Sequence, residues 1–251
     1  MIKEVSIVIH PEKEKDEKFI QKEICLALKK QGISFEEKDI STVFVKKSID
    51  ARHKNIKLFL RYKVYIGEKP ADENSLPEWK TTTGKKTVAI IGSGPAGLFG
   101  ALKLLEHGIK PVVIERGSET SKRKRDIAMI STTGIVDENS NYCFGEGGAG
   151  TFSDGKLYTR SNKRGNINGI LKIFTHFGAD KKILTDSHPH IGTDKLPAIV
   201  NNIRNFILQQ GGEFLFDTEC VDFILEKSED EKIVKGVVVK SHGEIKNIFA
   251  D

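Results

Sequence analysis

The sequence has few cysteines and no long hydrophobic run. Its 251 residues contain three cysteines, Cys25, Cys143 and Cys220, which are far apart and odd in number. This usage predicts neither a disulfide framework nor a metal site. No apolar stretch approaches the roughly 18 residues of a membrane-spanning helix. The N-terminus also lacks the apolar core and cleavage site of a signal peptide. We therefore expect a cytoplasmic protein with no membrane partner and no bound metal.

A strong excess of one charge is also missing. The chain has 40 Lys and Arg against 35 Asp and Glu, a net charge of +5. The lysines are spread along the chain and mostly balanced by nearby acids. The local exceptions are Lys46-Lys47 and the run Lys122–Arg125. Such runs usually form solvated faces unless a fold directs them at phosphates, so nucleic acid is not an expected partner.

The hydrophobic pattern changes along the chain and predicts two domains. Within residues 1–70, apolar residues alternate over Val5–Ile9, a helix is expected over Asp16–Lys30, and strands over Ile40–Val45 and Ile56–Ile66. This βαββ order predicts a small α+β, ferredoxin-like domain. Residues 71–86 lack periodicity and are expected to form a linker. Residues 87–251 then follow as a single α/β domain.

A glycine-rich turn opens that second domain. The apolar run Val88–Ile91 precedes it, as expected of a buried parallel strand. A helix with apolar residues at helical spacing follows it and closes at Gly108. In such a turn the first glycine allows a tight bend, the second lets the backbone approach a pyrophosphate, and the third brings helix and strand together. The predicted dinucleotide-binding residues of this turn are Gly92, Ser93, Gly94, Pro95, Ala96 and Gly97.

An acidic residue is expected to complete this dinucleotide site. Strand Val112–Ile114 delivers Glu115 at its carboxyl end. A carboxylate there can accept hydrogen bonds from both ribose hydroxyls and would repel a 2′-phosphate. The unpaired N–H groups and the dipole of the helix N-terminus would bind the phosphates. A strand, a glycine turn, a helix, a second strand and an acid follow one another in the expected order and spacing. This pattern predicts a Rossmann-type unit.

The rest of the chain favours FAD over NAD as the dinucleotide. A helix over Lys195–Gln210 and a short strand at Glu213–Phe216 precede three strand candidates, Val221–Glu226, Ile233–Lys240 and Glu244–Phe249. A NAD-type fold would continue with a crossover helix at this position. A three-stranded β-meander instead resembles flavoproteins of the glutathione-reductase type, an analogy at the level of the fold. By the same analogy the adenine would lie near Val221.

The segment Phe144–Leu157, FGEGGAGTFSDGKL, carries a more specific resemblance. With the GSGPAG turn, Glu115-Arg116-Gly117, His188–Leu196 and Lys47–Arg52, it resembles the bacterial family of uncharacterised FAD-dependent (NAD(FAD)-utilising) dehydrogenases. The resemblance implies that the glycine-rich loop lies against the flavin and its phosphates, and that Arg123 faces the pyrophosphate. It places these residues at the cofactor: Arg116, Arg123, Gly147, Gly148, Ala149, Gly150 and Thr151.

The loop supports this interpretation without the resemblance. Five glycines between Gly145 and Gly155 permit close backbone approach to a flat ring or an anion. Phe144, Phe152 and Leu157 would anchor the loop, which argues against a flexible surface segment. His188 and His190 lack further ligands nearby for a metal. The family's fold continues after the meander with another strand, so these residues are expected to be the N-terminal portion of a longer protein.

The expected function is that of an FAD-dependent oxidoreductase with an unidentified substrate. Flavin enzymes perform hydride transfer at the cofactor itself, which explains why no acid–base pair stands out as catalytic. NAD(P)H is a candidate electron donor, although no second GxGxxG is present. Two alternatives remain open. One is an FAD-dependent nucleic-acid (tRNA)-modifying or RNA-associated protein, and the other is a non-catalytic flavin-binding scaffold.

Overall fold

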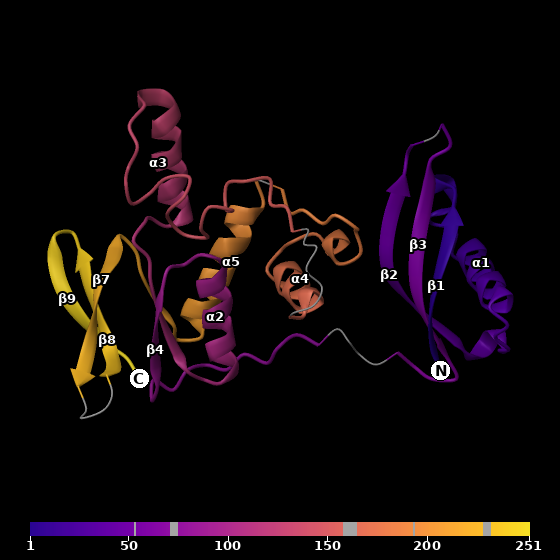
Figure 1. Cartoon of the computed structure of the whole chain (residues 1–251), viewed down its shortest axis with the longest axis horizontal. Helices are drawn as coiled ribbons and strands as arrows, with labels where there is room; N and C mark the ends of the chain where they lie inside the picture. Colours follow the sequence, from indigo (N-terminus) through magenta and orange to yellow (C-terminus); the bar gives the residue numbers. More distant parts are fainter. Residues whose placement is uncertain (53, 71–74, 158–164, 193, 228–231) are drawn as a thin grey trace. The chain divides into compact units, whose positions relative to one another are not determined.

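The computed structural model describes residues 1–52, 54–70, 75–157, 165–192, 194–227 and 232–251 (Figure 1). They form two compact units. The first comprises Met1–Leu76, Lys156–Thr175 and Asp180–His190, and the second Pro77–Gly155, His176–Ala179 and Ile191–Asp251. The domain limits 1–70, 71–86 and 87–251 stay predictions, and this division differs from them by grouping two later segments with the first unit. Thr193, within the motif His188–Leu196, lies outside the described residues.

The first unit contains the expected βαββ order. Its main elements are β1 (Ile2–Ile9), α1 (Glu17–Lys30), β2 (Ile40–Asp50) and β3 (Lys57–Ile66), with 3-10 turns at Pro11–Lys13 and Glu37–Asp39. The sheet order is β1-β3-β2, and both pairings are antiparallel. Strand β3 therefore lies between β1 and β2, as in a split βαβ unit. The side chain of Asp16 caps α1 by accepting a hydrogen bond from the Phe19 amide at 3.0 Å.

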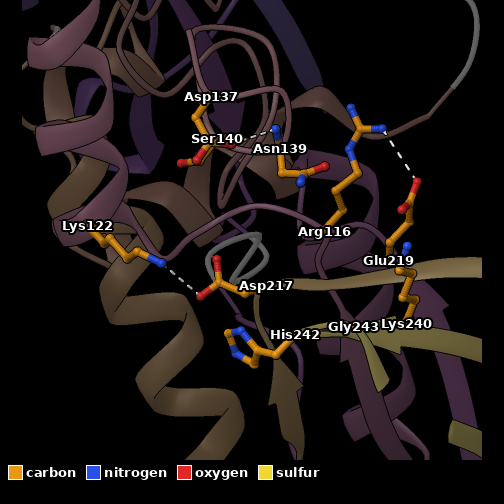
Figure 2. A pocket seen from close by; sticks show the side chains of 10 residues that line it. All are labelled: Arg116, Lys122, Asp137, Asn139, Ser140, Asp217, Glu219, Lys240, His242 and Gly243. Carbon is orange, nitrogen blue, oxygen red and sulfur yellow. Dashed lines mark hydrogen bonds and ion pairs between the residues drawn. The ribbon is translucent and has the colours of Figure 1, made fainter. Parts of the chain in front are cut away.

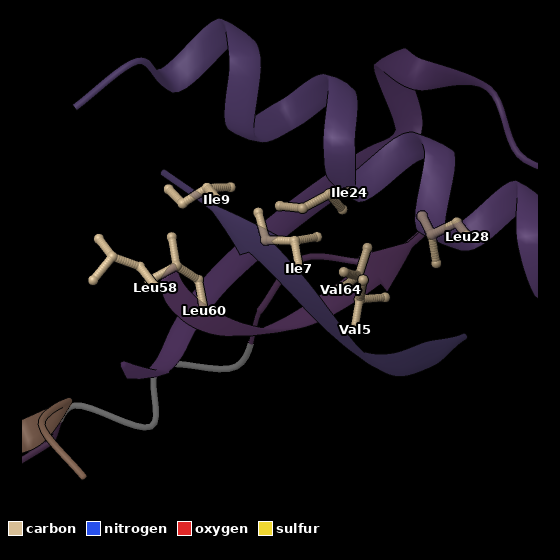
Figure 3. Packing of buried hydrophobic residues seen from close by; sticks show 8 residues of the cluster. All are labelled: Val5, Ile7, Ile9, Ile24, Leu28, Leu58, Leu60 and Val64. Carbon is tan, nitrogen blue, oxygen red and sulfur yellow. The ribbon is translucent and has the colours of Figure 1, made fainter. Parts of the chain in front are cut away.

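The core of this unit lies between the sheet and α1 (Figure 3). Successive strand residues point to opposite faces of a sheet, so every second residue of β1 faces α1. Two residues one helical turn apart, Ile24 and Leu28, cover that face and are fully buried. The cluster comprises Val5, Ile7, Ile9, Ile24, Leu28, Leu58, Leu60 and Val64.

A later segment runs along the edge of this sheet. The Lys47 amide of β2 donates to the Thr185 carbonyl at 2.8 Å, and the Ser187 amide donates to the Lys47 carbonyl at 3.1 Å. A 3-10 turn at Lys181–Leu184 precedes this bridge, and helix α4 spans Ile167–His176. Neither element is among those predicted from the sequence. The bridge gives hydrogen-bond partners to part of the otherwise open edge of β2.

The second unit combines a parallel and an antiparallel sheet. The parallel sheet has the order β4-β5-β6, with β4 at Thr87–Ile91, β5 at Lys110–Ile114 and β6 at Glu213–Leu215. Its helices are α2 (Pro95–Glu106), α3 (Thr120–Thr133) and α5 (Leu196–Gln209). The antiparallel sheet consists of β7 (Thr218–Lys227), β8 (Lys232–Ser241) and β9 (Glu244–Phe249) in sequential order. The predicted three-stranded meander is therefore confirmed, whereas α3 was not predicted.

The two sheets of this unit share a core. Val112 and Ile114 of β5 pack with Val237 and Val239 of β8, and all four are buried. Helices α2 and α5 lie next to one another beside the parallel sheet (Figure 1). This packing holds the carboxyl ends of β4 and β5 in place, and ligands of open α/β sheets bind at that end.

The segment before β4 is docked by Trp79. Its ring packs against Phe177 and Phe206, with centroid separations of 5.8 and 5.1 Å. The Lys80 amide donates to the Leu105 carbonyl at 3.0 Å. Trp79 therefore anchors the C-terminal part of the expected linker within the second unit.

The structure also bears on membranes and metals. In the described part of the chain, no helix is both long and apolar enough to cross a bilayer. Within the same residues, no group of three or more His, Cys, Asp or Glu side chains could hold a metal ion.

Candidate functional site: a dinucleotide cradle

The glycine turn between β4 and α2 has the geometry that its sequence predicts. Gly92 adopts a φ of +92°, which L residues rarely reach. Helix α2 begins directly after Gly94, with Pro95 in its first turn. A Cβ atom at Gly97 would overlap the carbonyl oxygen of Gly92. Glycine is therefore required at 92 for backbone conformation and at 97 for the close approach of helix and strand.

Glu115 lies at the end of β5 and ties two turns together. Its Oε2 atom accepts hydrogen bonds from the amide and the hydroxyl of Ser93, each at 2.8 Å. Its Oε1 atom accepts one from the Gly117 amide at 2.9 Å. The residue is 7% exposed, so these bonds satisfy a nearly buried carboxylate. A carboxylate offers about four acceptor positions, which leaves room for a ligand hydroxyl.

The glycine-rich loop docks directly on this turn. The Gly147 amide donates to the Ser93 carbonyl at 2.9 Å. A Cβ atom at Gly148 would lie 3.4 Å from the Cα of Gly94 and 3.3 Å from Pro95. The two glycine-rich segments, 50 or so residues apart, therefore approach backbone to backbone. Side chains at these positions would fill the space between the two segments. Their absence leaves backbone N–H groups accessible, as expected of a cradle for phosphates.

A pocket of about 210 Å³ opens beside this contact. Five predicted residues line it, namely Gly92, Gly94, Glu115, Arg116 and Gly148. The sequence reasoning missed the others. The remaining lining residues are Ile91, Ile114, Cys143, Phe144, Gly145, Thr218 and Cys220.

Phe144 is the most informative of the missed residues. The Arg116 guanidinium lies over its ring, 3.8 Å from the centroid. Phe144 is also 45% exposed, so one side of its ring is accessible to a ligand. The cation and ring form a flat surface at the pocket wall. The only signal in the sequence is the aromatic residue at the start of the glycine loop, which by itself predicts an anchor for that loop.

Other predicted residues support the pocket from behind. Ser93, Gly97 and Gly147 are buried and hold the turn and loop, while Pro95, Ala96, Ala149 and Gly150 lie next to them and do not line the pocket. Thr151 is fully buried, and its hydroxyl donates to the Glu146 carbonyl at 3.2 Å. It therefore stabilises the loop from within.

Val221 and Arg123 also lie differently from expectation. Val221 is the extra residue of a β-bulge, because Cys220 pairs with Val239 and Asp222 pairs with Val238. Its neighbour Cys220 lines the pocket and Val221 does not. Arg123 was expected to face a pyrophosphate, but its side chain is fully buried and bonded to loop carbonyl groups. Likewise, the basic run Lys122–Arg125 is not a uniformly solvated face.

A buried ion pair holds the loop to two helices. Glu146 is fully buried, and its carboxylate accepts a hydrogen bond from the Thr120 amide at 2.7 Å, in the first turn of α3. Arg204 of α5 approaches it with an Nε–Oε1 separation of 3.4 Å, an ion-pair contact without hydrogen-bond geometry. Arg204 also pairs with Glu119 at 2.6 Å. Burial raises the pKa of the Glu146 carboxyl, and the Thr120 hydrogen bond and Arg204 oppose that rise.

A second, more polar hollow of about 370 Å³ adjoins the pocket through Arg116 (Figure 2). Its cations are largely paired with acids. Lys122 contacts Asp217 at 3.0 Å, and Arg116 contacts Glu219 at 3.9 Å. The hydrogen bond that Lys122 donates to Asp217 raises the pKa of Lys122. Because opposite charges neutralise each other here, the hollow lacks the net charge of a phosphate site.

Two family models match parts of the chain. Residues 1–65 match a domain of unknown function (DUF8436), and residues 85–134 match an FAD binding domain. The second match covers the glycine turn, Glu115, Arg116 and Arg123. It thus includes the turn and the acid of the cradle, whereas the glycine-rich loop follows after the matched segment.

Comparisons with individual proteins cover more of the chain than the family models do. An uncharacterized protein of Clostridium beijerinckii is 36% identical over 232 residues, which are 86% of this chain and 42% of the relative. The chain thus spans less than half the length of that relative. Among solved structures, THI4 of Thermovibrio ammonificans shares 16% identity, with 66% of this chain and 54% of the other covered and a TM-score of 0.43. The 3-ketosteroid delta1-dehydrogenase of Sterolibacterium denitrificans shares 14%, with coverages of 66% and 46% and a TM-score of 0.32.

The residues present fit a dinucleotide whose phosphates lie on backbone. The helix N-terminus at Gly94, the glycine–glycine contact and the Glu115 carboxylate are all in one place. The matched family specifies which dinucleotide this is. FAD is the cofactor of this part of the chain.

Proposed function

We propose that the protein to which this chain belongs is an FAD-dependent oxidoreductase. The observation that carries the proposal is the docking of Gly147 and Gly148 on the turn Gly92–Gly97. That turn lies within the segment 85–134, which matches an FAD binding domain. Two backbone segments without side chains meet where a helix begins. That arrangement suits a pyrophosphate, because backbone N–H groups and the helix dipole favour an anion.

Each part of the cradle has a proposed role. The N-terminus of α2 and Gly94 bind the pyrophosphate, and Glu115 accepts a hydrogen bond from the ribose. The bulge at Val221 supplies backbone for the adenine edge, and the surface formed by Arg116 and Phe144 covers the adenosine. FAD supplies the hydride chemistry, so the protein contributes binding and orientation.

Further proposals follow from the sequence. The arrangement of sheet and meander is that of the glutathione-reductase type, and the chain is a portion of a dehydrogenase of the FAD-dependent (NAD(FAD)-utilising) kind. NAD(P)H is the proposed electron donor, and the substrate is a small molecule. The proposed setting is the cytoplasm, without a role for nucleic acid or membrane.

FAD titration with a matched pair of glycine variants tests the cofactor site. A Cβ atom at Gly94 would lie 3.9 Å from its nearest neighbour, so alanine fits the folded protein but enters the ligand space. Gly100→Ala is the control, because Gly100 lies in α2 and a Cβ there would be 4.0 Å from Ile90 of β4. We expect Gly94→Ala to lose FAD binding while Gly100→Ala keeps it. Equal binding by both variants would refute the assignment of the turn.

Anaerobic reduction tests the activity. The proposed oxidoreductase predicts that NADH or NADPH bleaches the flavin absorbance of the FAD-loaded, full-length protein. A flavin that is bound but is not reduced by any nicotinamide donor would instead favour the scaffold alternative. Salt-dependent binding to mixed tRNA would favour the nucleic-acid alternative.

A further inference from the structure

Arg123 is the most unusual buried group of the second unit. It lies in the first turns of α3 and is 0% exposed, and it is the largest side chain in the fully buried set. Burying a guanidinium is costly unless its donors are satisfied. Its five hydrogen bonds, of 2.7 to 3.1 Å, end on the carbonyl oxygens of Asn141, Tyr142, Gly145, Glu146 and Gly148.

All of these acceptors belong to one short stretch of backbone. A single side chain thus fixes the carbonyl directions of the segment that begins the glycine-rich loop. Gly145 has a φ of +113°, and a Cβ atom there would lie 2.5 Å from Cδ of Arg123. Glycine is therefore required for the guanidinium to approach the loop. Arg123 can be buried here only because residue 145 is a glycine, and the loop carbonyl groups are in turn satisfied by Arg123.

The same segment forms the wall of the cofactor pocket. Gly145 and Gly148 line the pocket, and Gly148 meets Gly94 backbone to backbone. The Gly148 carbonyl accepts from Arg123 at 2.8 Å, and the adjacent Gly147 amide donates to Ser93 at 2.9 Å. The hydrogen bonds that Arg123 donates to the carbonyl groups of Gly145 and Gly148 therefore fix the position of this pocket wall.

The charge of Arg123 also matters at this place. Its hydrogen bonds among the described residues go to neutral carbonyl groups, so no bidentate carboxylate cancels the charge at short range. Desolvation lowers its pKa, and the nearby charges of Glu115 and Glu146 act in the opposite direction. A buried positive charge behind the loop favours an anion in front of it.

We infer that Arg123 is a positioning residue of the FAD site, which folds the segment Asn141–Gly148 into the shape that receives the pyrophosphate without touching it. The inference rests on the proposed function. It differs from the expectation that Arg123 faces the pyrophosphate, because its donors already bind carbonyl oxygens within the protein. The loop, not the guanidinium, makes the contact.

Variants of Arg123 test this role in two measurements. Arg123→Met removes the charge and the donors, Arg123→Lys keeps the charge, and Arg125→Met removes a charge from an exposed position of the same helix. Hydrogen exchange without FAD should become faster over residues 141–151 in Arg123→Met, and to a smaller degree in Arg123→Lys. Titration should show FAD affinity reduced about tenfold or more in Arg123→Met, with Arg123→Lys between it and the wild type. Arg125→Met should match the wild type in both.

The two measurements separate the inference from the proposed function. If the wild type does not bind FAD, the proposed function fails, while the exchange of residues 141–151 still tests whether Arg123 positions the loop. If the wild type binds FAD and Arg123→Met binds it equally well with an unchanged loop, the inference is wrong. A loss shared by Arg125→Met would also refute it, since it would reflect net charge.

A variant on the loop side covers the case in which Arg123→Met does not fold. Gly145→Ala forces the loop and Arg123 apart while keeping the guanidinium. It should reproduce the faster exchange and the weaker FAD binding.

Added methylguanidinium should partly restore FAD binding to Arg123→Ala, whereas methylammonium should not, because only the planar cation can reach several carbonyl groups at once. Equal rescue by both, or by neither, would argue against the proposed geometry.

Discussion

The amide and hydroxyl of Ser93 both donate to Oε2 of Glu115, at 2.8 Å each. One carboxylate oxygen thereby holds the turn after β4 to the end of β5. The pair places the acid beside the turn before any ligand binds, with Gly117 occupying the other oxygen at 2.9 Å. Glu115 is thus part of the framework of the site as well as a candidate ligand for the ribose.

Glu115→Gln should reduce both stability and cofactor binding. The glutamine amide can accept hydrogen bonds at only one end, so its NH2 group would face either the Ser93 or the Gly117 donor. A buried donor left without an acceptor costs about 1–3 kcal/mol. Urea unfolding of the FAD-free protein measures this loss. Wild-type stability in Glu115→Gln would show that the carboxylate does not hold the turns.

The glycines of the first turns of α2 should differ sharply in their tolerance of alanine. Gly97→Ala places a methyl group on the Gly92 carbonyl oxygen and should destabilise the protein by about 3 kcal/mol or prevent folding. Gly100→Ala has space and should stabilise it by up to about 1 kcal/mol, since alanine favours helix. Thermal unfolding of the two variants compares them directly. Similar midpoints would contradict the close helix–strand contact.

The turn Gly92–Gly97 could be predicted because its rules are local. Backbone conformation at Gly92, the helix start at Gly94 and close packing at Gly97 each depend on residues a few positions away. The strands of the meander were predictable for the same reason, since alternation and turn residues are read within about ten positions. The first unit followed from its alternating β1 and its amphipathic α1.

The supports of the site could not be read from the sequence. Helix α3 has few apolar residues, and one of its buried positions is a charged arginine, so it lacks the apolar face that predicts a helix. Arg123 is buried because carbonyl groups 18 to 25 residues later satisfy it. Phe144 lies in a loop without periodicity, and only the fold brings it to Arg116. Contacts of this range depend on tertiary structure.

Phe144→Ala should weaken FAD binding with little effect on folding. The ring is 45% exposed, so its removal leaves little cavity, and an exposed cation–π pair contributes about 0.5–1 kcal/mol. The lost surface is at the pocket wall, where we expect adenosine. Titration with FAD and with FMN, which lacks adenosine, distinguishes the two ends of the ligand. Weakened FAD binding with unchanged FMN binding is the expected result, whereas equal loss for both would place Phe144 elsewhere.

Glu146 should make the stability of the second unit depend on pH. Burial raises the pKa of its carboxyl in the folded protein above the ordinary value of 4.5. Between pH 4.5 and the raised pKa, the folded state binds more protons than the unfolded state. The free energy of unfolding therefore falls as the pH rises through this range. Glu146→Gln keeps an acceptor for the Thr120 amide and cannot ionise. Its unfolding free energy relative to the wild type should therefore increase as the pH rises above 4.5, by about 1.4 kcal/mol for each pH unit until the raised pKa is reached. Denaturant unfolding of both proteins across the acidic range measures this difference. A constant difference would mean that Arg204 fully offsets the burial of the carboxylate.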